Sequence, residues 1–304
     1  MEDKSSMKLL FSRKLKNGNW IVLAAGSEPL VIDEELADNL LQGADIEKKI
    51  YKETLEILKE SGFYADTGKN DILIPEEKKN LKWKILRCGL LTVGALASLI
   101  VLIVAIFIGV PLGNQIISNE VSLGVSVVYA VIFAGGTTVF HELMHIVFAR
   151  TWNGYFKGLH LNMRNATAVV SMTHIWVWSL LGRVCAISAG VIIDLVLLAC
   201  LSVVKLFYEN WIIISGISIL WLRILWQFRF HKNCDGRLLI MTILDNPLAD
   251  INEKNLDNTV YHKEIHIWKR LKIIGIIVDV VILVLWIIPF VFKICSYILG
   301  KYYI

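Results

Sequence analysis

The chain has 304 residues, of which 56% are hydrophobic and 19% charged, and its formal net charge is +4. The mean hydropathy of +0.59 excludes an ordinary soluble globular domain and is typical of a helical protein that crosses a bilayer several times. The positive charge is small and scattered, so nucleic acid is not expected as a partner. We therefore expect an α-helical, multi-pass protein of the cell membrane, surrounded by a lipid bilayer.

Residues 1–80 differ from the rest of the chain because they are polar and charged, without long apolar runs. They predict a small N-terminal α+β domain of the winged-helix type. An Asn17-Gly18 pair between two β-prone runs predicts a hairpin, and two other segments show helical spacing of apolar residues. The expected strands cover residues 11–16, 20–24, 63–64 and 72–74, and the expected helices cover residues 33–41 and 45–60. No catalytic constellation stands out in this domain, so we expect it to bind a partner.

Residues 81–304 form the second expected domain and carry five apolar segments. Each segment is close to the ~20 residues that a membrane-spanning helix needs. The segments cover about residues 85–110, 121–149, 180–207, 211–228 and 271–291, and the fourth is the shortest. Lysine and arginine gather before the first segment, after the second and after the fourth. Because positive charge marks cytosolic loops, this alternation predicts a cytosolic N-terminus and an external C-terminus.

The second apolar segment contains His141-Glu142-Leu143-Met144-His145, an H-E-x-x-H motif. Residues four apart share one face of a helix, so both imidazoles can bind one Zn²⁺. The glutamate after the first histidine can then act as general base towards a water held by the ion. Titratable side chains within an apolar helix are costly and are usually functional. The motif therefore predicts a zinc centre bound by His141 and His145, with Glu142 as the catalytic residue.

A catalytic zinc site needs a third protein ligand, which the motif does not supply. The metzincin pattern is excluded, because Phe148 and Thr151 stand where that pattern needs a glycine and a histidine. No glutamate follows the motif before Glu209. The remaining candidates are His160 and His174 in a polar loop expected to form short strands, Asp194 in the third apolar segment, and Asp235 after the fourth.

Among these candidates, topology favours Asp235 as the metal ligand, because it lies on the cytosolic side where both histidines are expected. Asp194 is expected midway through its segment, where an ionised group needs a partner. It is the alternative ligand, or it supports a ligand, faces substrate or pairs with Arg223. Asn233 could hydrogen-bond a substrate carbonyl.

The H-E-x-x-H motif and Asp235-Gly236 together resemble the site-2 protease family of intramembrane zinc metalloproteases. The resemblance covers roughly residues 85–245. It extends to Ser188–Asp194, in which Val191 and Asp194 stand where the family often has proline and asparagine. The resemblance implies zinc coordination by His141, His145 and Asp235, with Glu142 as general base.

The first 80 residues are similar to the small PqqD-like leader-recognition domains of ribosomal peptide modification systems. The similarity rests on Trp20–Leu23, Leu30–Asp33 and the spacing of Leu55, Leu58 and Gly62. It implies that this domain binds a precursor peptide at an exposed strand edge. Both halves together resemble peptide zinc metalloproteases encoded beside modified, exported peptides such as epipeptides. A transporter and a peptide-modifying enzyme are therefore further expected partners.

These observations predict a membrane-embedded zinc endopeptidase that cleaves a peptide precursor or a membrane-bound substrate, in the maturation of a ribosomally made modified peptide. One alternative is a non-catalytic, peptide-binding membrane protein for export or immunity, which could keep zinc for structure. A second alternative is a regulated intramembrane protease that acts on an anti-sigma factor. The activity of a Glu142 variant separates the first alternative, and the partner of the N-terminal domain separates the second.

Overall fold

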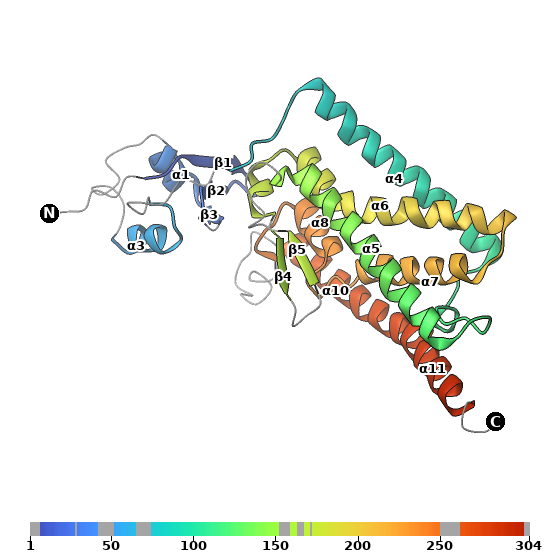
Figure 1. Ribbon diagram of the computed structural model, residues 1–304. Helices are drawn as coiled ribbons and strands as arrows, with labels where there is room; N and C mark the ends of the chain where they lie inside the picture. The colour runs from blue at the N-terminus through green and yellow to red at the C-terminus, as the bar shows by residue number, and fades with distance from the viewer. Residues whose placement is uncertain are drawn as a thin grey trace.

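The molecule divides into a small N-terminal part and a bundle of long helices (Figure 1). We call residues 7–64 the front domain and residues 74–300 the helical domain. The front domain lies at one end of the helices, and the C-terminus lies at the other end. The computed structural model describes residues 7–27, 29–41, 52–64, 74–151, 159–162, 167–170, 172–249 and 262–300.

The front domain is built on a three-stranded antiparallel sheet in the order β1-β2-β3. Strands β1 (Leu10–Lys14) and β2 (Trp20–Ala24) pair across the turn that contains Asn17 and Gly18, which confirms the predicted hairpin. Asn17 Oδ1 accepts a hydrogen bond from the backbone N–H of Asn19 at 3.1 Å, as is common in such turns. Strand β3 (Leu30–Ile32) pairs with β2 and forms the far edge of the sheet among the described residues.

Two helices complete the front domain, α1 (Glu34–Leu41) and α3 (Lys52–Glu60). Asp33 caps α1, because its Oδ1 accepts a hydrogen bond from the N–H of Leu36 at 2.8 Å. Of the helix predicted over residues 45–60, the described part is α3. The predicted strand over residues 72–74 lies mostly outside the described residues, and Tyr64 instead pairs with Met7 in an isolated bridge. The core of the front domain consists of Val22, Ala24, Leu40, Leu58 and Phe63.

Four helices in the described part of the chain are long and apolar enough to cross a membrane. The first three match the first three predicted segments. The fourth is longer than predicted at both ends. On its N-terminal side the helix continues through basic residues, which are good helix formers. The four are α4 (Leu81–Ile108), α5 (Leu123–Ala149), α6 (Leu180–Phe207) and a continuous helix over Lys263–Gly300, whose parts are α10 (His262–Ile282), η6 (Leu283–Ile287) and α11 (Ile288–Gly300).

The fourth predicted span corresponds to α7 (Trp211–Trp226), which is apolar but has only 16 residues. Asn210 caps its start, since its Oδ1 accepts a hydrogen bond from the N–H of Ile212 at 3.0 Å. A helix of this length is shorter than the ~20 residues that a bilayer requires. The structure therefore has four candidate spans and one shorter apolar helix in its described part, where the sequence predicted about five spans.

Helix α6 is the central helix of the bundle. In its most apolar stretch of 18 residues, 56% of the residues are buried, against 11% in the corresponding stretch of α5. It packs against α4, α5, α7 and α8 (Asp235–Leu244), as Figure 1 shows. Small residues permit these close contacts: a Cβ on Gly94 of α4 would lie 2.8 Å from the side chain of Ile192. Side chains of α6 therefore contact the inner faces of the surrounding helices.

Short elements connect α5 to α6 and contact the front domain. Strands β4 (Leu159–Asn162) and β5 (Thr167–Val170) pair antiparallel where the sequence predicted short strands, and η4 (Thr173–Val177) follows them. Both β1 and β2 contact η4. The front domain thus packs on the end of the bundle at which α5 ends and α6 begins.

Candidate metal centre

Helix α5 brings His141 and His145 to one buried face. Ser122 caps the helix by accepting a hydrogen bond from the N–H of Val125 at 3.4 Å, and no proline interrupts the helix. The four-residue spacing therefore keeps both imidazoles on the same side of α5. The two histidines are 4% and 2% exposed, and their Nε2 atoms lie 3.1 Å apart.

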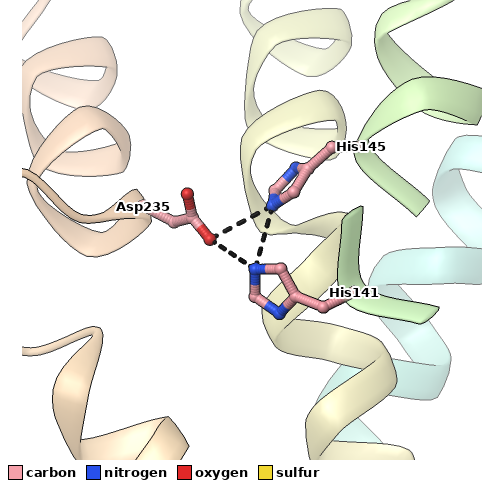
Figure 2. A group of neighbouring side chains, drawn as sticks. All are labelled: His141, His145 and Asp235. Carbon is pink, nitrogen blue, oxygen red and sulfur yellow. Dashed lines mark hydrogen bonds and ion pairs between the residues drawn. The ribbon is translucent and has the colours of Figure 1, made fainter. Parts of the chain in front are cut away.

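Asp235 reaches the histidines from α8, of which it is the first residue (Figure 2). Its Oδ2 lies 2.9 Å from His141 Nε2 and 3.1 Å from His145 Nε2. Its backbone N–H donates to Gln227 Oε1 at 3.1 Å. The next residue is Gly236, where a Cβ would lie 1.9 Å from the carbonyl oxygen of Gln227. This close approach of α8 to the end of α7 holds Asp235 in place, and it requires glycine.

The two imidazoles also stabilise the ionised form of Asp235. Burial raises the pKa of this carboxyl group, but attraction to His145 and the hydrogen bonds with both histidines lower it more. The net result is a pKa below the usual value for aspartate. Asp235 is therefore a carboxylate at neutral pH, which is the form that binds a metal ion.

Helix α6 fixes the tautomers of both histidines. His145 Nδ1 lies 2.8 Å from the backbone carbonyl oxygen of Ala186, which can only accept a hydrogen bond. His141 Nδ1 lies 2.8 Å from Asp194 Oδ2, which accepts as a carboxylate. Both Nδ1 atoms therefore carry a proton, so Nε2 is the nitrogen that gives up its hydrogen bond to Asp235 and offers a lone pair when a metal ion binds.

These contacts bring three electron-pair donors together: two imidazole nitrogens and a carboxylate oxygen, separated by 2.9–3.1 Å. Such atoms repel one another unless protons or a cation lie between them. Ligands at about 2.0–2.1 Å from a tetrahedral zinc ion lie roughly 3.3 Å apart, so the observed spacing suits an ion of that size. The donor set of two histidines and one carboxylate is also one that zinc commonly has in catalytic sites. The residues present therefore fit a zinc ion.

The room for an ion comes from α6, where glycine stands beside both histidines. A Cβ on Gly190 would lie 2.5 Å from the Nε2 atoms of His141 and His145. Ala186, Gly190 and Asp194 follow one another at four-residue spacing, so they share one face of the helix. The sequence prediction did not assign a role to Ala186 or Gly190. The signal that could have found them is this spacing of small residues ahead of a buried aspartate.

Glu142 follows His141 on α5 and is half-buried. It lies close enough to His141, His145 and Asp235 to interact with them electrostatically. Glu142 is not one of the three candidate ligands, so its carboxylate can exchange protons with a molecule bound at the centre.

The other sequence candidates lie elsewhere. Asp194 contacts the Nδ1 side of His141 and pairs with Arg223, so it stands behind the ligand group. His174 is buried in η4, and its Nε2 donates to the carbonyl oxygen of Ala149 at 2.7 Å. The side chain of His160 lies outside the described part of the structure. Asn233 is exposed, and its Oδ1 accepts a hydrogen bond from Arg237.

The segment that leads to Asp235 is anchored on the last long helix. Asp279 of α10 forms an ion pair with Arg229 and also contacts His231, whose Nε2 lies 2.9 Å from Asp279 Oδ2. Gly275 permits the contact, because a Cβ there would lie 2.7 Å from the backbone nitrogen of Phe230. Asp279, a charged residue in an apolar helix, thus connects α10 to the turn between α7 and α8.

Comparisons with known proteins add no information about function to this geometry. No family model matches the chain, and searches of curated proteins and of solved structures find no match.

Proposed function

We propose that this chain is a membrane-embedded zinc endopeptidase of the site-2 protease type. The observation that carries the proposal is the convergence of His141 Nε2, His145 Nε2 and Asp235 Oδ2 within 3.1 Å of one another. Their location supports it, because α5 is among the helices that can cross a membrane. A hydrolytic centre at this depth acts on peptide bonds within or beside the bilayer.

The protein supplies the ligands and the proton transfer. His141, His145 and Asp235 would hold the ion, which supplies Lewis acidity when bound and thereby activates water and polarises the scissile carbonyl. Glu142 accepts the proton of the attacking water and delivers it to the leaving amide nitrogen. Substrate binds in an extended form, because a helix keeps its carbonyl groups in internal hydrogen bonds.

The decisive experiment replaces Glu142 with Gln in the full-length protein purified in detergent. We expect E142Q to retain about one zinc per chain by elemental analysis and to lose cleavage of an internally quenched peptide library. The matched control is E120Q, because Glu120 is an exposed glutamate in the turn before α5 and should leave both readouts unchanged. An E142Q protein that cleaves at the wild-type rate would contradict the mechanism. Zinc without cleavage in the wild type would favour the non-catalytic alternative, a peptide-binding export or immunity protein.

The front domain is the proposed recognition module, as its resemblance to PqqD-like domains implies. Its strand β3 pairs only with β2 among the described residues, so an extended precursor peptide can add to the free edge. A photo-crosslinking amino acid at Val31 tests this proposal, with the same amino acid at Lys59 on α3 as control. A short peptide crosslinked only from Val31 supports peptide maturation. A transmembrane regulator in its place supports the signalling alternative, in which the protease acts on an anti-sigma factor.

The proposed location is the cell membrane, with the N-terminus in the cytosol. The loops before α4 and between α7 and α10 are rich in lysine and arginine, and positive charge is retained on the cytosolic side. Front domain and metal centre would then both be accessible from the cytosol. Because the two termini lie at opposite ends of the helices (Figure 1), the C-terminus is then expected outside. Reporter fusions at both termini test the orientation, and a cytosolic C-terminal reporter would contradict it.

A further inference from the structure

A buried ion pair stands directly behind His141. Asp194 is fully buried, and its Oδ2 lies 2.8 Å from His141 Nδ1 and 3.2 Å from Arg223 Nη2. Its other oxygen has no hydrogen-bond partner among the described residues. One carboxylate oxygen therefore makes both contacts, and the orientation of the His141 ring depends on where Arg223 holds that oxygen.

Arg223 joins three helices through one guanidinium group. It lies on α7, pairs with Asp194 of α6, and donates from Nη1 to α5. The acceptors on α5 are the carbonyl oxygen of Ala134 at 3.3 Å, Thr137 Oγ1 at 3.2 Å and the hydroxyl of Thr138. Thr137 precedes His141 by four residues, so it lies one turn away on the same face. Arg223 thus fixes both the α5 backbone before His141 and the carboxylate that His141 binds.

The pair also sets the charge of the centre. The positive charge of Arg223 offsets that of Asp194, so Asp235 is the carboxylate that faces the Nε2 atoms of both histidines. Without Arg223, Asp194 would be a fully buried charge with only His141 Nδ1–H as a partner, which is strongly unfavourable in this setting.

We infer that Asp194 and Arg223 are positioning residues of the metal centre. Asp194 holds His141 in the tautomer that points Nε2 at the ion, and Arg223 holds Asp194 and cancels its charge. The inference rests on the proposed function only as far as metal binding, and proteolysis is not required for it. His141 needs an oxygen acceptor here, and the buried charges must balance. Replacing Asp194 or Arg223 alone should therefore weaken metal binding more than replacing both.

The test uses cobalt(II) as the probe with the full-length protein in detergent. Its visible absorption reports the coordination geometry, and competition with a chelator gives the affinity. We expect D194N to bind cobalt more weakly, because the charge of Arg223 is then unpaired beside the cation. R223Q should also bind more weakly and change the spectrum, because Asp194 loses its anchor. Each loss should be roughly 10- to 100-fold, as is common for groups that orient metal ligands.

The double variant D194N/R223Q distinguishes positioning from packing. It keeps an oxygen acceptor for His141 and leaves no unpaired charge, so we expect affinity within about threefold of wild type and a wild-type spectrum. R223K, which keeps the charge but offers fewer hydrogen bonds, should be intermediate. The matched control is R87Q: Arg87 pairs with Glu77 at 2.6 Å, both side chains are buried, and neither residue contacts the ligand group in the described structure.

Several results would overturn the inference. These are single variants that bind cobalt like wild type, losses that add up in the double variant, and an R87Q protein that loses as much affinity as R223Q. A wild-type chain that binds no cobalt would overturn the inference and the proposed function together. A chain that shows the expected cobalt pattern but cleaves nothing would overturn the proposed function alone.

Discussion

Arg13 on β1 and Asp245 at the end of α8 form an ion pair with two hydrogen bonds, of 3.0 Å and 2.8 Å. Asp245 is 6% exposed and also accepts hydrogen bonds from Arg183 at 2.8 Å and from the backbone N–H of Lys16 at 3.1 Å. Helix α8 begins at Asp235. One short helix therefore carries a candidate metal ligand at its start and the contact with the front domain at its end.

Replacing Arg13 with Gln should loosen the front domain from the helical domain. The substitution removes a charged, two-bond contact to a buried carboxylate, for which we expect a loss of roughly 1–3 kcal/mol in docking free energy. Hydrogen exchange of the amides in β1 and at the end of α8 should become faster. The control is K14Q, because Lys14 pairs with Glu34 at the surface and such pairs contribute little. Equal exchange in R13Q and K14Q would show that the pair does not hold the domains together.

Acid should release the same contact. Burial raises the pKa of Asp245, but hydrogen bonds from Arg13 and Arg183 lower it more, so it lies below the unfolded value of 3.8. A lowered carboxyl pKa contributes stability that is complete above the unfolded pKa and is lost as the pH falls through the folded pKa. Docking should therefore be constant from about pH 5 to 8 and weaken below about pH 4. In D245N the docking should be weaker at every pH and should depend less on acid. If wild type and D245N lost docking in parallel as the pH falls, Asp245 would not be the group responsible.

Replacing Asp235 with Asn should abolish stable zinc binding, because the charged oxygen that faces both Nε2 atoms is lost. We expect elemental analysis to find well under one zinc per chain after dialysis, with the helical content unchanged by circular dichroism. N233A is the nearby control, because Asn233 is exposed and bonded to Arg237. It should retain zinc, and any effect on the binding of a peptide should appear in KM. A D235N protein with full zinc content would remove Asp235 from the ligand set.

Replacing Gly190 with Ala should displace the histidines even though alanine is the better helix former. The new Cβ would lie 2.5 Å from both Nε2 atoms, at the place where the ion is expected. We expect zinc to be lost while the thermal stability stays near that of wild type. The control is G89A on α4, where nothing lies within 4 Å and stability should rise by up to about 1 kcal/mol. Zinc retained in G190A would mean that the ion sits elsewhere.

Local patterns predicted the elements that depend on neighbouring residues. The Asn17-Gly18 turn gave the hairpin, and hydropathy gave the three long helices α4, α5 and α6. The same patterns could not separate the short helix α7 from a membrane span, since composition is similar and only three residues separate it from α6. The length of the last helix was likewise underestimated, because its first turns are basic and continue beyond the apolar run.

The sequence by itself determined that His141 and His145 share a helix face, because that follows from a four-residue spacing. It favoured Asp235 over Asp194 by topology but could not decide between them, because both are long-range partners whose distance from the histidines depends on how the helices pack. Tertiary structure placed Asp235 at the Nε2 atoms and Asp194 at Nδ1 of His141. It also gave Gly190 its role, since the space beside the histidines exists only where α5, α6 and α8 meet.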